Sequence, residues 1–171
     1  RIKRLNNTLK LEKKDILEKA HRDALTGAYN RLGIRDKLIF AMESRTKLGI
    51  QFCLILIDID DFKKLNDTKG HLEGDKALIN LVNLLISNLR ETDYLCRWGG
   101  EEFFVLIMNA NIDAAKGLAE KLREKIEKSS LGFTCSFGVA QSLDKEFEEI
   151  LDSADKALYK AKKQGRNQVC F

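Results

Sequence analysis

Apolar and polar positions repeat along the chain with two different periods, and the changes between them divide it into helices and strands. Residues 52–57 are an unbroken apolar run, which is typical of a strand buried on both faces. Two apolar stretches near 92–97 and 103–107, separated by a pair of glycines, predict a hairpin. The remaining patterns predict strands at 133–140 and 167–171, and helices at about 30–47, 61–67, 74–90, 112–128 and 146–163.

This order of elements predicts an α/β fold around one central sheet. A chain of 171 residues has room for one domain with a sizeable core and hardly for two. It is 44% hydrophobic and 33% charged, and no apolar run approaches the roughly 18 residues of a membrane helix, so we expect a soluble segment. The chain begins at Arg1 with neither an initiator Met nor a signal-like stretch, which suggests a piece of a longer protein.

Residues 1–22 have a different character from the rest of the chain. They are rich in Lys and Glu, and apolar residues recur near helical spacing, which predicts an amphipathic linker helix that precedes a domain at 23–171. Two interpretations stay open, a signalling or dimerising helix and a solvated helix packed on its own domain, because fewer than three heptads are visible. The apolar positions are Ile2, Leu5, Leu9, Ile16 and Ala20.

Charge and cysteine content narrow the possible partners. A net charge of +4 from 30 basic and 26 acidic residues does not indicate nucleic-acid binding, and we expect no nucleic-acid partner. Four cysteines lie far apart and none forms a CxxC pair, so buried reduced thiols in a cytoplasmic protein are favoured over a structural zinc site. They are Cys53, Cys96, Cys135 and Cys170.

Acidic residues follow the apolar run directly, and two more follow the glycine pair. Asp58, Asp60 and Asp61 could be a solvated strand end, but carboxylates held at the edge of a core suit a hard cation. A plain hairpin does not need the acids Glu101 and Glu102 next to its turn. If the two strands are neighbours, Asp58 and Glu101 converge and supply oxygen ligands for Mg²⁺ and the phosphates that it bridges.

A polar stretch at 66–75 is predicted to be a loop between two helices. Its Asn66 amide and Asp75 carboxylate have the hydrogen-bonding groups that match the edge of guanine, although a bare loop of this composition is ordinary. Lys63, Lys162 and Arg166 are candidates for contacts to triphosphate oxygens, or are simply surface charges.

Taken together, these motifs resemble the GGDEF family of diguanylate cyclases, in its GGEEF variant. The resemblance runs from about residue 21 to the end. Four separated motifs and a C-terminal one occur in the family's order and spacing, at 23–31, 58–63, 66–75, 97–103 and 162–167.

The resemblance implies a palm-like fold, with a five-stranded sheet of mixed direction flanked by helices. It also implies that Asp58, Glu101 and the Ile59 carbonyl bind metal, with Glu102 close by, and that two Mg²⁺ or Mn²⁺ ions serve each half-site. By the same resemblance, Asn66 and Asp75 hold guanine, Phe62 and Lys63 line the phosphates, and Lys162 with Arg166 binds the outer phosphates.

The reaction implied is the condensation of two GTP molecules into cyclic di-GMP and two pyrophosphates. A 3′-hydroxyl attacks the α-phosphorus of a second GTP, and Glu101 or Glu102 takes its proton; the sequence does not choose between them. Because each domain holds one GTP, a symmetric homodimer is expected. An upstream sensor or receiver domain would control it, and the full protein would be cytoplasmic or the cytosolic part of a membrane-anchored sensor.

One more element of the family pattern is Arg90-x-x-Asp93, six positions before the glycine pair. In the family this spacing forms an inhibitory site for the product, and Lys121 stands where many members place a second arginine. Without the family, an ordinary helix end followed by a strand start would explain these residues. The alternatives to an active cyclase are an inactive domain that binds cyclic di-GMP or GTP, a purely structural or dimerising domain, and another palm-type nucleotidyl cyclase.

Overall fold

The computed structural model describes residues 12–13, 16–143 and 145–171, and its central element is β1 (Phe52–Ile59). All eight residues of β1 are buried, because strands flank both of its edges and helices cover both of its faces. The predicted five-stranded sheet of mixed direction is confirmed. In the order β2-β3-β1-β4-β5, β3 (Glu102–Met108) is antiparallel to β1 and to β2 (Tyr94–Gly99), β4 (Cys135–Gln141) is antiparallel to β1, and β5 (Val169–Cys170) is parallel to β4.

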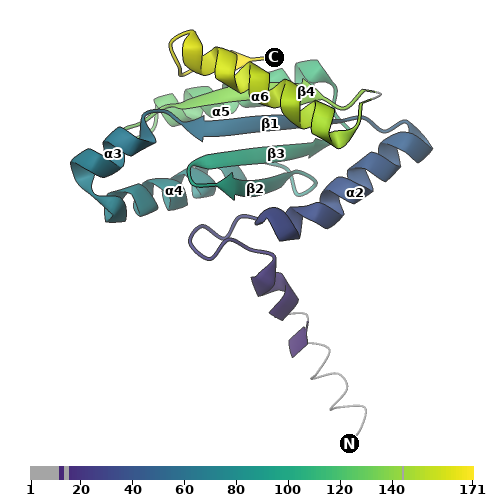
Figure 1. Ribbon diagram of the computed structural model, residues 1–171, viewed down its shortest axis with the longest axis horizontal. Helices are drawn as coiled ribbons and strands as arrows, with labels where there is room; N and C mark the ends of the chain where they lie inside the picture. Colours follow the sequence, from purple (N-terminus) through teal and green to yellow (C-terminus); the bar gives the residue numbers. More distant parts are fainter. Residues whose placement is uncertain (1–11, 14–15, 144) are drawn as a thin grey trace, which may run out of the picture.

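Two pairs of helices cover the sheet, one pair on each face. Figure 1 shows α2 (Arg31–Leu48) and α6 (Phe147–Lys163) on the near side, with α4 (His71–Ile86) and α5 (Ile112–Glu127) behind the strands. The short α3 (Phe62–Lys69) follows β1 directly and lies at the end of the sheet where β1 finishes. Residues contributed from far apart in the sequence therefore meet around the C-terminal end of β1.

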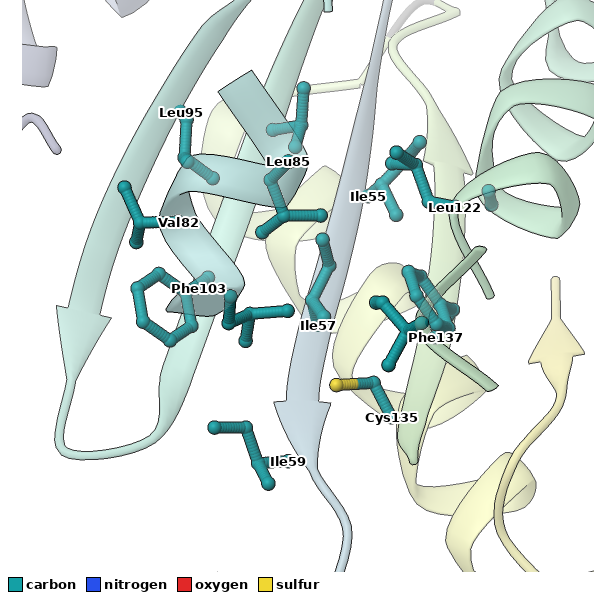
Figure 2. Close-up of a cluster of buried hydrophobic side chains, with 14 of the residues drawn as sticks. Ile55, Ile57, Ile59, Val82, Leu85, Leu95, Phe103, Leu122, Cys135 and Phe137 are labelled. Carbon is teal, nitrogen blue, oxygen red and sulfur yellow. The ribbon is translucent and has the colours of Figure 1, made fainter. Parts of the chain in front are cut away.

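Because successive side chains of β1 point to opposite faces of the sheet, the strand contributes residues to two hydrophobic clusters. Its odd-numbered residues pack against α4 and α5, and its even-numbered residues pack against α2 and α6. Burial of one such aliphatic or aromatic side chain contributes about 1.5–3 kcal/mol, so both layers are held firmly to the strand. Figure 2 shows the first cluster, which includes Ile55, Ile57, Ile59, Val82, Leu85, Phe103, Leu122 and Phe137.

Local capping explains where the two helices on the near face begin and end. The side chain of Asn30 caps α2 by accepting a hydrogen bond from the Gly33 N–H, and Gly49 ends the helix at φ 69°. At the start of α6, Glu146 and Glu149 form a reciprocal capping box. These ends agree with the predicted helices at 30–47 and 146–163 to within two residues.

The predicted loop at 66–75 is wrong. Residues 66–69 belong to α3 and residues 71–75 to α4, so only Gly70, at φ 87°, separates the two helices. The glycine can adopt this backbone without strain, which lets one helix begin directly where the other ends. The polar residues that suggested a loop are instead the solvated side of two helices, and α4 covers 71–86 in place of the predicted 74–90.

Other differences lie at the ends of elements. The last strand was predicted at 167–171 and covers only 169–170, because a left-handed turn occupies the residues before it. Of the helix predicted at 1–22, residues 12–13 and 16–20 are helical, residues 1–11 and 14–15 lie outside the described residues, and the helix ends earlier than predicted because His21 is in a turn and Arg22 forms a β-bridge with Tyr29. Across the described ranges, no helix combines the length and the apolar character that crossing a membrane requires. The four cysteines are free, buried thiols.

Candidate active site

The end of β1 lies beside the start of β3, so the two acidic clusters share one edge of the sheet. Asp58 is directly opposite Glu102 in the antiparallel register, and Glu101 precedes it in the hairpin turn. Asp58 is buried, Glu101 is half-buried and Glu102 is exposed. Figure 1 shows this turn and the end of β1 at the same side of the domain, next to α3.

The carboxylate of Asp58 is in an environment that resists its ionisation. Burial raises its pKa to about 6, an effect that the nearby charges of Glu101 and Glu102 increase and that Lys162 opposes. Lys162 Nζ lies 2.7 Å from Asp58 Oδ2 and comes from the last turn of α6. Three carboxylates and one ammonium group are thus grouped around the end of β1.

The donor atoms at this edge suit a hard divalent cation. The Asp58 and Glu101 carboxylates and the Ile59 carbonyl are oxygen donors, which Mg²⁺ prefers. Among the residues that the structure describes, no group of three or more His, Cys, Asp or Glu side chains is arranged to hold a metal. Protein sites for Mg²⁺ commonly use only one or two carboxylates and leave the other positions to water and substrate phosphates, so the residues fit such an ion.

The glycine pair makes a turn that two arginines hold in place. Gly100 lies at φ 31°, and its carbonyl accepts a hydrogen bond of 2.9 Å from Arg97 Nε. The same guanidinium forms an ion pair of 3.0 Å with Asp23, and Arg31 Nε donates to the carbonyl of Trp98 at 2.6 Å. The segment that follows the N-terminal linker is therefore bonded to the turn that carries Glu101. Sequence reasoning did not assign these three contacts, although their residues stand inside the motifs at 23–31 and 97–103.

Asn66 and Asp75 lie on α3 and α4, on either side of Gly70. The Oδ1 atom of Asn66 is buried and has no hydrogen-bond partner within the described part of the chain. It rests against Gly74, where an added Cβ would collide with it. A buried acceptor without a partner is costly, and a ligand with a suitable donor would satisfy it. The carboxylate of Asp75 is exposed beside it on the next helix.

The start of α3 is open toward solvent. Asp61 takes a left-handed conformation at φ 55°, and no side chain in the described residues caps the N-terminus of the helix. Phe62 is packed in the core against α4, so only its backbone N–H can face a ligand, whereas Lys63 is exposed. Free N–H groups at a helix N-terminus attract anions.

The last turn of α6 and the turn that follows it bring two basic side chains to the acids at the end of β1. Lys162 pairs with Asp58, as described above, and Arg166 Nε lies 3.5 Å from Asp61 Oδ1. The Arg166–Asp61 pair is exposed and therefore weak. Arg166 can exchange this partner for another anion at little cost.

A second candidate site lies at the other end of β2. Arg90, Asp93 and Lys121 line one cavity of about 480 Å³ between the α4–β2 connection and α5. Asp93 accepts a hydrogen bond of 3.0 Å from the Arg90 N–H through Oδ2, while its buried Oδ1 has no partner among the residues described. Burial raises the pKa of this carboxyl. The six residues of β2 separate this cavity from the glycine turn, about 20 Å along the strand.

Comparison with known proteins shows the same architecture and motifs. Residues 20–168 match the sequence profile of the family described as "Diguanylate cyclase, GGDEF domain". The chain is 38% identical over 161 residues to the probable diguanylate cyclase DgcT of Escherichia coli, and 37% identical over 163 residues to the diguanylate cyclase DgcP of Pseudomonas aeruginosa. The aligned regions cover 88% and 91% of this chain but only 35% and 24% of the two relatives.

Two solved structures illustrate the likeness in three dimensions. One is the coiled coil and GGDEF domain of DgcB from Caulobacter crescentus in complex with c-di-GMP, at a TM-score of 0.87 and 28% identity, covering 99% of this chain and 92% of that one. The other is the active GGEEF domain of a diguanylate cyclase from Vibrio cholerae, at a TM-score of 0.79 and 32% identity, covering 82% and 95%. With these motifs on this palm-like sheet, the chain belongs to the GGDEF-domain family of diguanylate cyclases.

Proposed function

We propose that this domain condenses two molecules of GTP into cyclic di-GMP and releases two pyrophosphates. The observation that carries the proposal is the grouping of Asp58, Glu101 and Glu102 beside Lys162 at the shared end of β1 and β3. Carboxylates and an ammonium group placed together suit phosphoryl transfer. Charge on the phosphate oxygens must be neutralised in this reaction while a hydroxyl loses its proton. The relatives named diguanylate cyclases support the same reaction.

The polar groups of Asn66 and Asp75, on α3 and α4, would select guanine. The Asp75 carboxylate would accept hydrogen bonds from the N1–H and the exocyclic amine of guanine, and the Asn66 amide would meet O6 or N3. Adenine has a lone pair at N1 that would face the carboxylate, so ATP is disfavoured. The triphosphate would extend from there over the open start of α3, with contacts from the Phe62 N–H and Lys63, toward Lys162 and Arg166.

Asp58, Glu101 and the Ile59 carbonyl would hold Mg²⁺ or Mn²⁺, two ions per half-site, with Glu102 close by. Bound divalent ions supply Lewis-acid stabilisation of phosphate charge and favour ionisation of the attacking hydroxyl. Glu101 or Glu102 takes the proton of the 3′-hydroxyl of one GTP. The 3′-oxygen then forms a bond to the α-phosphorus of the other GTP. The bond between that phosphorus and the oxygen that bridges it to the β-phosphorus breaks, and pyrophosphate leaves. Lys63 and Lys162 stabilise the charge that develops on the phosphates.

Each domain would bind one GTP, so two domains must face each other in a homodimer, with the linker at 1–22 between the catalytic domain at 23–171 and an upstream sensor or receiver domain. The chain spans well under half of the two curated relatives described above, which leaves room for such domains. In this arrangement the full protein works in the cytoplasm or on the cytosolic side of a membrane.

The test is product formation from GTP with Mg²⁺ at several protein concentrations. We expect cyclic di-GMP and pyrophosphate at a specific rate that rises with protein concentration, because only dimers turn over. GTP should be used in preference to ATP when both are present, as resolved by product mass. A sample shown to be dimeric that makes no product would contradict the proposal and favour a domain that binds cyclic di-GMP or GTP without turning it over.

The cavity that contains Arg90, Asp93 and Lys121 would bind the product and inhibit the enzyme. Replacement of Arg90 by alanine should raise the product concentration needed for half-maximal inhibition at least about tenfold, because a charge-assisted contact to a guanine or phosphate is lost. The initial rate should change little. The exposed neighbour Glu91, replaced by glutamine, is the matched control. An inhibition curve that does not move in Arg90→Ala would exclude this site as the inhibitory one.

A further inference from the structure

Asp60 stands between the two acids of the candidate phosphate and metal site, yet its side chain is used in a different way. It is one of five buried polar or charged residues in the described part of the chain and is 8% exposed. Its Oδ1 accepts from Ser136 Oγ at 2.6 Å, and its Oδ2 accepts from Thr134 Oγ1 at 2.7 Å and from the Asn167 N–H at 3.0 Å. With three donors satisfying it, this carboxylate is engaged by protein and not presented to a cation.

The contact with Asn167 reaches the turn that ends α6 and carries Arg166. Three successive residues in this turn lie in the left-handed region, Gly165 at φ 116°, Arg166 at φ 64° and Asn167 at φ 43°. Glycine and asparagine tolerate such a backbone, but arginine pays a free-energy cost for it. A strained residue of this kind persists only where its surroundings hold it.

Asn167 holds the turn with three hydrogen bonds, in addition to the one that the Arg166 N–H donates to the Ala161 carbonyl at 3.0 Å. Its N–H donates to Asp60, its Oδ1 accepts from Arg123 Nη1 at 3.1 Å, and its Nδ2 donates to Glu127 Oε1 at 2.7 Å. Both partners on the last turns of α5 belong to a helix that packs on the opposite face of the sheet from α6. Asp60, which directly follows β1, and two side chains of α5 thus hold the turn in place. This turn sets the direction of the Arg166 side chain.

We infer that Asp60 is a positioning residue for the outer phosphates of the nucleotide: by holding the Asn167 N–H, it keeps the left-handed turn that aims Arg166 at the start of α3. This inference rests on the proposed function, because the outer phosphates are those of the proposed GTP. It assigns a different role to each of the three acids at the end of β1. Asp58 serves the metal, Asp61 provides the exposed resting partner of Arg166, and Asp60 holds the turn.

The test compares Asp60→Ala with Asp60→Asn by calorimetric titration with two probes. One is the α,β-methylene analogue of GTP, whose carbon bridge prevents release of the leaving group, and the other is GMP, which has no outer phosphates. Asp60→Ala should bind the triphosphate analogue about tenfold more weakly than the wild type and bind GMP equally well, because only the Arg166 contact is lost. Asp60→Asn should bind the analogue within about threefold of the wild type, since its carbonyl can accept from Thr134 and Asn167 while its amide donates to Ser136.

The double variant Asp60→Ala with Arg166→Ala decides whether Asp60 acts through Arg166. It should bind the analogue no more weakly than Arg166→Ala alone, whereas two independent losses would multiply. If Asp60→Ala does not fold, Asp60→Ser takes its place in the same cycle, because its shorter side chain removes the carboxylate that holds the Asn167 N–H and still offers the buried site a polar group.

The outcomes separate the inference from the function on which it rests. Failure of the wild type to bind the analogue contradicts the proposed function. A wild type that binds, together with Asp60→Ala or its substitute that binds equally well, overturns the inference alone. A loss of binding in Asp60→Asn as large as in Asp60→Ala would also overturn it, because that pattern indicates a charged metal ligand.

Discussion

Glutamine in place of Glu101 should reduce the rate of cyclic di-GMP formation by about 10³-fold. The substitution keeps the size of the side chain and removes the negative charge that would hold a cation and accept a proton at the end of β1. The loss should appear in kcat, because the proposed mechanism places this residue at the reacting atoms, while binding of GMP through the proposed contacts to guanine should be unchanged. Rates of pyrophosphate release and the mass of the nucleotide product measure the effect.

Glu43→Gln is the matched control for this variant. Glu43 is an exposed carboxylate on α2 that pairs with Lys47 of the same helix at 2.9 Å, and loss of such a pair has little effect on a protein. Its activity should equal that of the wild type. If Glu101→Gln retained more than about a tenth of the wild-type rate, a catalytic role for this residue in proton transfer or metal binding would be untenable.

Asparagine in place of Asp58 should abolish activity and at the same time stabilise the fold. The pKa of Asp58 is about 6 in the folded protein, above its ordinary value of 3.8, so the folded state binds this proton more tightly than the unfolded state. Its contribution to stability is therefore most favourable below about pH 4 and declines as the pH rises to about 6. At pH 7.5 without metal, Asp58→Asn should raise the free energy of unfolding by roughly 1–2 kcal/mol, below the limit of about 3 kcal/mol set by the two pKa values.

Urea unfolding of both proteins at pH 7.5 and pH 4 tests the sign of this effect. The gain should largely disappear at pH 4, where Asp58 of the wild type is itself protonated. Asp61→Asn makes the same chemical change on an exposed neighbour and should alter stability by less than about 0.5 kcal/mol at either pH. A variant Asp58→Asn that is less stable than the wild type at pH 7.5 would show that the ion pair with Lys162 outweighs the burial of the charge.

The fold could be predicted from the sequence wherever one physical signal was strong. The apolar run at 52–57 can only be a strand buried on both faces, and the glycine pair can only be a tight turn, so the centre of the sheet and its hairpin followed directly. The start of α4 was missed because polar residues on the solvated side of a helix have the composition of a loop. A single glycine at position 70 gives no signal of whether it breaks one helix or joins two.

The geometry of the site depended on details that sequence patterns do not contain. The structure pairs Asp58 with Glu102 across β1 and β3 and leaves Glu101 in the turn, and a separate irregularity between Arg97 and Gly99 shifts the pairing of β2 with β3. The direction of the Asp60 side chain could not be predicted from the sequence either, because its hydrogen-bond partners at 134, 136 and 167 are far away along the chain. Alternation along a strand stops predicting orientation once the strand ends, and Asp60 lies one residue beyond that point.

Gly74 leaves room for the Asn66 side chain, which is part of the proposed guanine site. It carries no side chain, its backbone is ordinary helix, and yet the amide oxygen of Asn66 occupies the space that a methyl group would need. Even alanine, the residue that helices favour most, would push this amide aside by more than the tolerance of a hydrogen bond. At this position the intrinsic preference of a helix for alanine conflicts with the space that the Asn66 side chain needs, and the chain has the residue that leaves this space open.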